Sequence, residues 1–222
     1  QSSYRIYAVS PKERMITLDD KLYALMETDA DAARRSTFIE WRRMMLALCR
    51  EEDGLTAEEA RARFGDMLTR AGIDAQAVVI GQSDLREARA QLGTSMCEAV
   101  YAARAAKLCG KAALGARELG LYAYLFPMSE NPFVCDRCRR VLSAIREYDA
   151  QNHTNLEQTA LVYVKENMEI AAAAKALFQH PNTVRYRLSK IQRIMGMEDD
   201  PLFAPMLSLT VSLSRILTEE QA

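Results

Sequence analysis

Long apolar runs are absent from the 222-residue sequence, since none approaches the roughly 18 residues that a membrane-spanning helix needs. The N-terminus also lacks the basic stretch followed by an apolar one that marks a secretion signal. Cysteines are few and odd in number, at five, which excludes a disulfide scaffold and favours a reducing compartment. We therefore expect a cytoplasmic protein with no membrane partner.

An excess of charge of one sign is lacking as well. Lys and Arg number 29 against 30 Asp and Glu, and the formal net charge is −1. A protein that is basic all over is thereby excluded, so any surface that binds nucleic acid must be local. The hydrophobic fraction of 49% and the charged fraction of 27% are those of an ordinary globular protein that buries a full core.

Proline is sparse, and it marks one break in the chain. Residues 127–132 carry two prolines together with Ser129 and Asn131, a combination that resists a continued helix. Before this stretch helix and strand patterns alternate, and after it nearly every pattern is helical. The sequence predicts an α+β protein with an α/β domain over 1–127, a linker over 128–132 and an all-helical domain over 133–222.

Strand and helix patterns divide the first domain. Alternating side chains predict a strand over 4–9, and an apolar run predicts a buried central strand over 78–81. A second strand is expected within 16–26. Asp29 and Asp31 are expected to open a helix. That helix carries an apolar stripe at helical spacing, formed by Phe38, Trp41, Met45, Leu48 and Cys49.

Capping boxes predict three further helix starts. In such a box a Ser or Thr hydroxyl and a Glu carboxylate three residues later satisfy free backbone amides. The boxes begin at Thr56, Ser95 and Thr154, and the second is expected to open a helix to residue 108. Ser83 is also expected to cap a short helix that Gly93 ends.

Residues 170–195 form the most informative segment, with a short Ala-rich helix, a tight turn and a longer helix. Ala173 and Ala174 are small enough to let the two helices approach closely. Pro181 and Asn182 end the turn and begin the second helix. This pattern is typical of the helix-turn-helix, a DNA-binding motif.

The second helix of this motif has an apolar stripe and a polar face. Val184, Leu188, Ile191 and Met195 follow at i, i+4, i+7 and i+11, so they must face the core. Between residues 181 and 196 there are four basic residues and no acidic one. The predicted DNA-binding side chains lie in the turn, on the polar face or beside the stripe, and they are His180, Asn182, Thr183, Arg185, Tyr186, Arg187, Ser189, Lys190 and Arg193.

Such a helix suits the major groove of double-stranded promoter DNA, and we predict a recognition helix over 182–195. Arg and Lys bind phosphates and guanine edges, Asn binds adenine, and Thr and Tyr suit the backbone or a methyl group. The alternative, a surface helix whose charges are only solvated, is disfavoured because the short helix, the turn and the capped preceding helix all fit the helix-turn-helix motif. His180 is expected to be a turn or phosphate-contact residue and not a metal ligand.

The same segment resembles the C-terminal helix-turn-helix of PucR/CdaR-type bacterial transcriptional regulators. The specific core is Asn-Thr-x-x-Tyr-Arg-Leu at residues 182–188, and residues 156–163 and 173–178 also resemble the family. Pro181 departs from it, because an Arg is usual there, and this departure would remove one phosphate or base contact. The resemblance implies a homo-oligomer, and a dimer would place two recognition helices about one DNA turn apart.

The first domain resembles, more weakly, the degenerate diguanylate-cyclase (GGDEF-like) domain that precedes the motif in this family, an α/β sandwich. The carriers are residues 79–83, 95–103 and 118–122. A working cyclase needs a Gly-Gly-acidic-acidic-Phe turn and metal-binding carboxylates, and residues 1–126 match neither, nor do they hold a glycine loop that binds phosphate. We therefore expect no enzyme, no cofactor and no metal site.

The resemblance also implies a biological setting. Family members are associated with purine catabolism, sugar-diacid use and polyketide synthase expression, and such a protein would be associated with the nucleoid when bound to DNA. Members usually carry a further N-terminal sensor region. The first residue here is Gln1 and not Met, so whether the chain is a fragment that lacks this region stays open.

Two alternative functions stay open beside DNA binding. One is an effector-sensing or protein-interaction module that does not contact DNA directly, and a small-molecule effector remains a candidate partner. The other is a thiol or metal sensor through Cys135 and Cys138, because the neighbouring Arg137 and Arg139 favour the thiolate. A zinc site would need a second pair of ligands at suitable spacing, so two helix cysteines without a sensing role are the simpler interpretation.

Two kinds of substitution test the assigned faces of the second helix. Leu188→Ala removes a core side chain and is expected to lower the free energy of unfolding by about 2–5 kcal/mol. Tyr186→Ala or Lys190→Ala, on the polar face, is expected to leave Tm nearly unchanged and to weaken DNA binding. Thermal unfolding and fluorescence anisotropy with a DNA duplex measure the two effects. An unfolded Lys190 variant would show that the faces are assigned wrongly.

Overall fold

The computed structural model describes residues 3–13, 18–51, 54–87 and 91–219. The chain divides into two compact units, Gln1–Ala123 and Tyr124–Ala222, called here the sheet unit and the helical unit. Each is described by itself. The α+β class predicted from the sequence is confirmed, with strands in the first unit and helices throughout the second.

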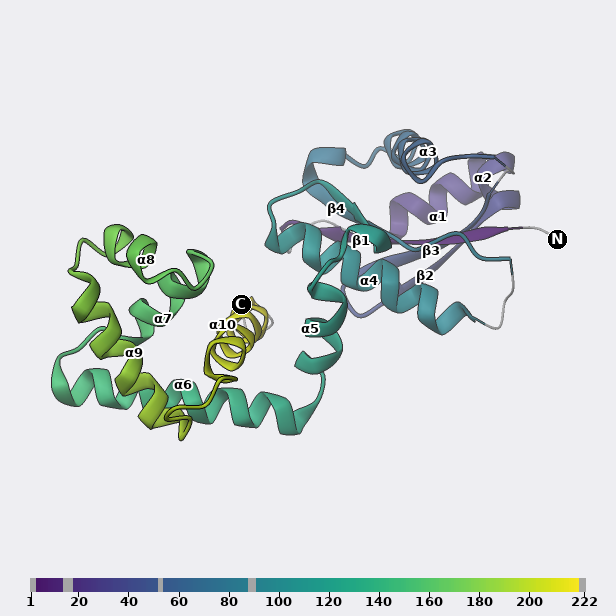
Figure 1. Ribbon diagram of the computed structural model, residues 1–222. Helices are drawn as coiled ribbons and strands as arrows, with labels where there is room; N and C mark the ends of the chain where they lie inside the picture. The colour runs from purple at the N-terminus through teal and green to yellow at the C-terminus, as the bar shows by residue number, and fades with distance from the viewer. Residues whose placement is uncertain (1–2, 14–17, 52–53, 88–90, 220–222) are drawn as a thin grey trace. The chain divides into compact units, whose positions relative to one another are not determined.

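The sheet unit is a three-layer α/β sandwich. Its five strands lie in the order β2-β3-β1-β4-β5, antiparallel except for the parallel pair β4 and β5. The strands are β1 Tyr4–Pro11, β2 Ser36–Trp41, β3 Met44–Arg50, β4 Val78–Gln82 and β5 Ala113–Gly115. The helices are α1 Asp19–Thr28, α2 Ala30–Arg35, α3 Ala57–Arg70 and α4 Leu92–Leu108. Side chains of α1, α2 and α3 pack on one face of the sheet and those of α4 on the other (Figure 1).

The central strands carry apolar side chains on both faces. In β1, Tyr7 and Val9 enter the core beneath α1 to α3, whereas Ile6 and Ala8 enter the core beneath α4. The strand predicted over 4–9 is thus confirmed. The buried strand predicted over 78–81 is confirmed as β4, which lies inside the sheet between β1 and β5.

Two predictions in the first 50 residues are wrong. The expected strand within 16–26 is helix α1, in which Leu22 and Leu25 are buried at i and i+3; residues 16 and 17 lie outside the described residues. The helix expected from Asp29 onward ends at Arg35 and gives way to the hairpin of β2 and β3. The spacing of the apolar residues from Phe38 to Cys49 is compatible with the period of a helix and with that of a strand. The β-branched and aromatic residues of β2 favour a strand.

The helix starts were predicted with mixed success. The Thr56 capping box is confirmed, with Glu59 N donating to Thr56 Oγ1 at 3.2 Å and Thr56 N donating to Glu59 Oε2 at 2.9 Å. The box at Ser95 is wrong, because α4 already begins at Leu92 and Ser95 is buried inside it. Gly93 therefore lies within α4 and does not end a helix.

The short helix expected from Ser83 is also not found in the residues described there. Ser83 instead follows β4, where its Oγ accepts a hydrogen bond from Ile6 N at 2.8 Å. Arg86 then pairs with Tyr4, the first residue of β1, through two backbone hydrogen bonds. Residues 88–90 of the expected helix lie outside the described residues. The Ser83 hydroxyl therefore accepts from an amide of the adjoining strand β1 and not from a helix amide.

The described residues of the helical unit hold six helices, of which the first begins two residues before the unit does. They are α5 Tyr122–Ser129, α6 Pro132–Asn152, α7 Leu156–Lys165, α8 Ile170–Ala176, α9 Pro181–Met195 and α10 Phe203–Glu219. Side chains of α6 to α10 share one core. The segment 128–132, predicted as a linker, holds the end of α5 and the start of α6, where Asn131 Oδ1 accepts from Phe133 N at 3.0 Å. Among the described helices none is long and apolar enough to cross a membrane.

Gly81 sets the distance between the sheet and α4. A Cβ atom at this position would lie 1.9 Å from Ala99 O and 2.3 Å from Ala103 N, both of them backbone atoms of α4. The alanines that face the sheet from α4 are fully buried. Because backbone atoms cannot turn aside as a flexible side chain can, only glycine fits between β4 and α4.

Gly81→Ala is therefore expected to push α4 off the sheet and to lower the free energy of unfolding by about 3 kcal/mol or more. Urea denaturation followed by circular dichroism measures this loss. Gly65→Ala is the matched control, since Gly65 lies in the middle of α3 with nothing within 4 Å of the added Cβ. That control is expected to gain about 0.5–1 kcal/mol from helix propensity. Equal stabilities of the two variants would contradict the close approach.

Candidate nucleic-acid interface

Three helices, α7, α8 and α9, form a compact helix-turn-helix unit around small and aliphatic side chains. Ala173 and Ala174 of α8 are buried, and methyl side chains let the backbones of α8 and α9 approach closely. On α9 the predicted stripe faces the core, with Val184, Leu188 and Ile191 buried. Met195 packs partly buried against the same core. The stripe determines which side of α9 is turned away from the protein.

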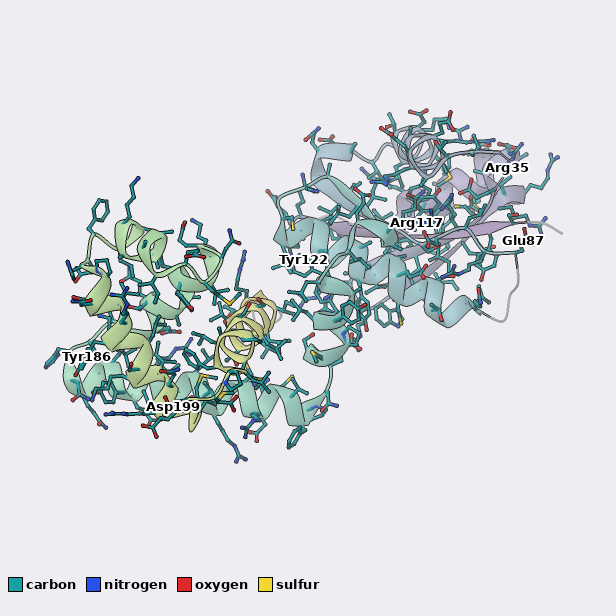
Figure 2. The ribbon with its side chains drawn as sticks, viewed as in Figure 1. Arg35, Glu87, Arg117, Tyr122, Tyr186 and Asp199 are labelled. Carbon is teal, nitrogen blue, oxygen red and sulfur yellow. The ribbon has the colours of Figure 1, made fainter. Side chains whose placement is uncertain are left out.

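The outer side of α9 carries polar side chains at the surface. Asn182, Ser189 and Arg193 are exposed, and Tyr186 is 59% exposed and projects away from the unit (Figure 2). Lys190, one turn after Tyr186, places its Nζ 5.4 Å from the centroid of the Tyr186 ring. This cation–π contact holds an aromatic ring and a positive charge side by side on the outer face.

The N-terminus of α9 is capped by its own turn. His180 Nδ1 accepts a hydrogen bond from Asn182 N at 3.2 Å, and Pro181 occupies the first helical position, where no amide hydrogen is needed. Arg185 Nη1 donates to Asn182 Oδ1 at 2.8 Å. Thr183 is half-buried between these residues. His180 is thus engaged as a helix cap, which agrees with its expected place in the turn.

Two further basic residues of α9 have protein partners outside this helix. Arg187 is half-buried, and its Nη1 donates to Oγ1 of the buried Thr159 on α7 at 3.2 Å. Arg193 forms an exposed ion pair with Glu198, with 2.9 Å between Nε and Oε1. Arg187 therefore ties α9 to α7, whereas the pair at Arg193 lies at the surface, where such pairs are weak.

Asp149, at the end of α6, caps the start of α7. Its carboxylate accepts from Leu156 N at 2.7 Å, from Glu157 N at 3.0 Å and from Thr154 Oγ1 at 2.6 Å. The capping box expected from Thr154 and Glu157 is therefore wrong, since the acceptor comes from the preceding helix. The capping role of Asp149 was not predicted, because the residue pattern at the start of α7 does not indicate an acceptor that lies seven residues earlier in the chain.

The protonation of Asp149 follows from these contacts. Partial burial raises the pKa of its carboxyl group, but the hydrogen bonds from Glu157 N, Thr154 and Leu156 N, together with the charge of Arg187, lower it by more. The net shift of the pKa is downward. The ionised carboxylate is therefore the form that joins α6 to α7 at neutral pH.

Cys135 and Cys138 lie buried in α6 and donate to backbone carbonyls. Cys135 Sγ lies 2.9 Å from Ser129 O, and Cys138 Sγ lies 3.4 Å from Thr210 O. Burial raises the pKa of the Cys138 thiol, the neighbouring Cys135 adds to the rise, and Arg139 opposes it. Arg139 thus favours the Cys138 thiolate, as expected, but burial outweighs it and the pKa rises. Within the described ranges no group of three His, Cys, Asp or Glu residues is arranged to hold a metal ion.

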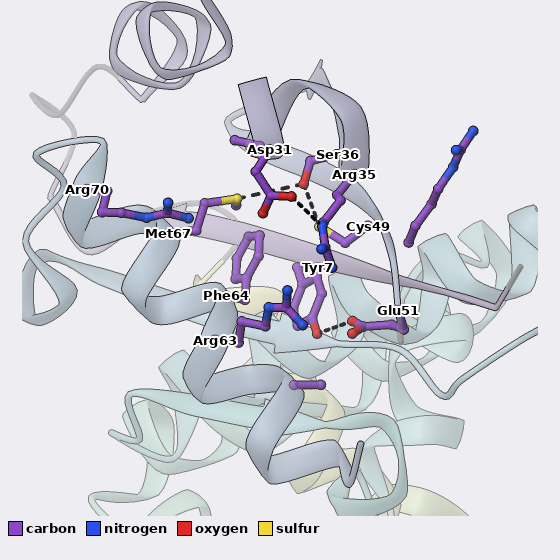
Figure 3. Close-up of a pocket in the computed structure, with 13 residues that line it drawn as sticks. Tyr7, Asp31, Arg35, Ser36, Cys49, Glu51, Arg63, Phe64, Met67 and Arg70 are labelled. Carbon is purple, nitrogen blue, oxygen red and sulfur yellow. Dashed lines mark hydrogen bonds and ion pairs between the residues drawn. The ribbon is translucent and has the colours of Figure 1, made fainter. Parts of the chain in front are cut away.

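A small cavity in the described part of the sheet unit is lined by residues of β1, β3, α2 and α3 (Figure 3). On its floor the rings of Tyr7 and Phe64 stack with centroids 4.0 Å apart, and Tyr7 Oη donates to Glu51 Oε1 at 2.7 Å. Burial raises the pKa of the Cys49 thiol in its wall to about 12. The cavity measures about 50 Å³, whereas ligand pockets usually measure about 300–1,000 Å³. It gives no support to an effector of ordinary size.

Residues 156–209 match the family model described as the PucR C-terminal helix-turn-helix domain. The chain is 31% identical over 81 residues to the DNA-binding transcriptional activator AdeR of Bacillus subtilis (strain 168), a match that covers 36% of this chain and 19% of that protein. It is 28% identical over 111 residues to the proline-responsive transcriptional activator PutR of the same organism, covering 49% of this chain and 27% of that protein. The chain thus covers less than a third of the length of either relative.

Among solved structures, the following one is similar over most of the chain. It is the crystal structure of a regulator of polyketide synthase expression from Bifidobacterium adolescentis, with 20% sequence identity and a TM-score of 0.41. The match covers 97% of this chain and 82% of that one. The resemblance of 156–209 to the PucR helix-turn-helix, expected from the sequence, is confirmed by the family model.

Asp149→Ala tests the cap between α6 and α7. We expect it to lower the free energy of unfolding by about 1–2 kcal/mol at pH 7, because two amides at the start of α7 lose their acceptor. Urea denaturation followed by circular dichroism measures the loss. Asp136→Ala is the matched control on α6, since the Asp136 carboxylate only pairs with the exposed Arg140 at 2.7 Å, and it is expected to cost at most about 0.5 kcal/mol.

The contribution of Asp149 is also expected to depend on pH. Because its pKa is lower in the folded than in the unfolded chain, its stabilisation is fully present above the unfolded pKa of about 3.9 and is lost as the pH falls through the folded pKa. The stability difference between wild type and Asp149→Ala should therefore shrink in acid. A difference that stays constant from pH 7 to the acid limit of folding would contradict the role of the ionised carboxylate.

Proposed function

Because residues 156–209 form a PucR-type helix-turn-helix domain, we propose that the chain is a sequence-specific, DNA-binding transcription regulator. In this proposal α9, residues 181–195, is the recognition helix and enters the major groove of promoter DNA. Both curated relatives are named as transcriptional activators and not as enzymes, which supports a non-enzymatic role.

The observation that carries the proposal is the polarity of α9 on its two sides. The buried stripe fixes the helix in the core, and the opposite side presents Asn182, Tyr186 and Lys190. From Ile170 to Met197 the sequence contains five basic residues and no acidic one, in a chain whose net charge is only −1. A local positive surface on a helix of this kind is what binding to a phosphate backbone and a groove requires.

The predicted side chains then take different roles. Asn182 and Lys190 are placed for base edges, where an amide suits adenine and a lysine suits guanine or a phosphate. Tyr186, Ser189 and Thr183 suit phosphate, sugar or methyl contacts. The basic or polar residues His180, Arg185 and Arg193 complete the proposed contact set as phosphate partners.

Arg187 is proposed to act indirectly. Its guanidinium is engaged with Thr159 on α7 and lies near enough to Asp149 for its charge to lower the pKa of that carboxyl group. A half-buried arginine with two such partners is better suited to fixing the angle of α9 than to binding a phosphate. We therefore separate Arg187 from the direct contacts predicted from the sequence.

A homo-dimer is the proposed binding form. A two-fold axis between two copies would set two α9 helices on half-sites about one helical turn of DNA apart. A small-molecule effector stays a prediction; the name of one relative refers to proline, and nothing in the described cavity argues for that or any other ligand.

Salt dependence of DNA binding tests the proposal. We would measure fluorescence anisotropy with a duplex from upstream of the protein's own gene and with a scrambled duplex, at several salt concentrations. Arg185→Ala is expected to weaken binding to both duplexes and to reduce the slope of log Kd against log salt by about 0.9, because one phosphate contact is lost. Asn182→Ala is expected to cost about 1–3 kcal/mol on the promoter duplex and much less on the scrambled one.

Arg215→Ala is the matched control for charge. Arg215 is exposed on α10, outside the three helices α7, α8 and α9 that form the helix-turn-helix unit. Its removal should leave both affinity and salt slope unchanged. The absence of binding to either duplex at low salt would overturn the proposed function.

A further inference from the structure

Five helices in the described part of the chain end in the same hydrogen-bond pattern. A residue at the helix end donates its N–H to the carbonyl three residues back, and the next residue donates to the carbonyl five residues back, as in the Schellman motif. In α8, Phe178 N donates to Lys175 O at 3.2 Å and Gln179 N to Ala174 O at 2.9 Å. The other four helices are α3, α4, α7 and α9.

The key position of this motif requires a left-handed backbone. Its occupants are Gly72, Gly110, Asn167 and Gly196 in four of the five helices, the residue types that adopt this conformation most readily. In α8 the occupant is Phe178, with a φ of 54°. A bulky side chain is disfavoured at such a φ, so the geometry of the turn does not account for the phenylalanine.

The hydrophobic core does not account for it either. Phe178 is 94% exposed, more than any other large hydrophobic residue among the described residues. An aromatic side chain normally offsets an unfavourable backbone by burial, and here almost no apolar surface leaves water. Phe178 thus carries an unfavourable backbone and an unfavourable exposure in the free protein. Strained residues of this kind tend to lie at functional sites.

The surroundings of Phe178 suit one partner. The residue lies in the turn between α8 and α9, two positions before His180, which caps the proposed recognition helix. The exposed Lys175 precedes it and the exposed Arg185 follows it, and no acidic residue occurs from 170 to 197. An exposed ring in a positive surface that is continuous with the proposed DNA-binding face is complementary to nucleic acid.

We propose that Phe178 is an apolar DNA contact, whose ring becomes buried against thymine methyl groups or deoxyribose at the edge of the groove that α9 enters. This inference rests on the proposed function. The ring would then gain on DNA the burial that it lacks in the free protein, and the strained turn would hold it in place beforehand. Apolar contacts to thymine methyl groups are an established means of base recognition.

The test uses substitutions that keep the turn and remove the ring. Phe178→Gly and Phe178→Asn place in this turn the residue types that occupy the same position in the other four helices. Both are expected to raise Tm by about 2–5 °C, because they relieve an unfavourable φ. Both are expected to weaken binding of the full chain to the promoter duplex on the order of tenfold in Kd, the size of an aromatic or methyl contact. Phe178→Tyr keeps the ring and should bind within about threefold of wild type.

The salt slope separates this role from a phosphate contact. Loss of an apolar contact releases no counterions, so the Phe178 variants should keep the wild-type slope, unlike Arg185→Ala. Leu202→Asn is the matched control for an exposed apolar side chain. Leu202 is 60% exposed in the same unit but adjoins the acidic residues 198–200, where DNA is repelled, and its loss should leave the affinity unchanged.

Three results would overturn the inference. The first is that wild type binds the promoter duplex and Phe178→Asn binds it equally well. The second is that the variant has a reduced salt slope, which would indicate a displaced basic residue. The third is that analytical ultracentrifugation without DNA gives a different oligomeric state for wild type and Phe178→Asn, which would make the ring a contact between copies. Failure of the proposed function is a separate outcome, in which wild type itself binds neither duplex at low salt.

Discussion

The burial of one stripe of α9 is the constraint on which the rest of the helical unit depends. Val184, Leu188 and Ile191 are buried in the core that α6, α7, α8 and α10 share, and the buried methyl groups of Ala173 and Ala174 bring α8 close beside them. A helix fixed in this way has only one rotation about its axis, so Asn182, Tyr186 and Lys190 point outward together. The outer chemistry of α9 is therefore a consequence of packing on its inner side.

Polar contacts join the helices of this unit in addition to the apolar core. The carboxylate of Asp149 binds the first amides of α7, and Arg187 reaches from α9 to Thr159 of α7. The two charged groups also influence each other, since the charge of Arg187 lowers the pKa of Asp149. Three helices are thus joined by directional bonds at the end of the unit where the helix-turn-helix begins. Directional bonds fix angles more sharply than apolar contacts do, and a recognition helix needs a defined angle.

The sequence predicted those features that arise within one helix, and it failed where partners come from elsewhere in the chain. The helix-turn-helix segment and the faces of α9 followed from local spacing, whereas the apolar residues from Phe38 to Cys49 fitted a helix and a hairpin equally well until pairing with β1 decided. Ser95 looked like a helix cap but lies inside α4. Asp149 as a cap and Arg187 as a brace depend on contacts over seven or more residues, which local patterns do not encode.

The helix ends that share the hydrogen-bond pattern of α8 give the exception at Phe178 its meaning. Gly72, Gly110 and Gly196 occupy the left-handed position at three of the five helix ends that share this hydrogen-bond pattern, whereas α6, whose end differs, has His153 at a φ of 51°. Because glycine is used at these equivalent positions, a phenylalanine at 178 needs a reason other than the geometry of the turn. A residue that lowers the stability of the free protein is expected where the same residue increases the affinity for a binding partner. The turn before the proposed recognition helix is a position from which such a residue would contact DNA.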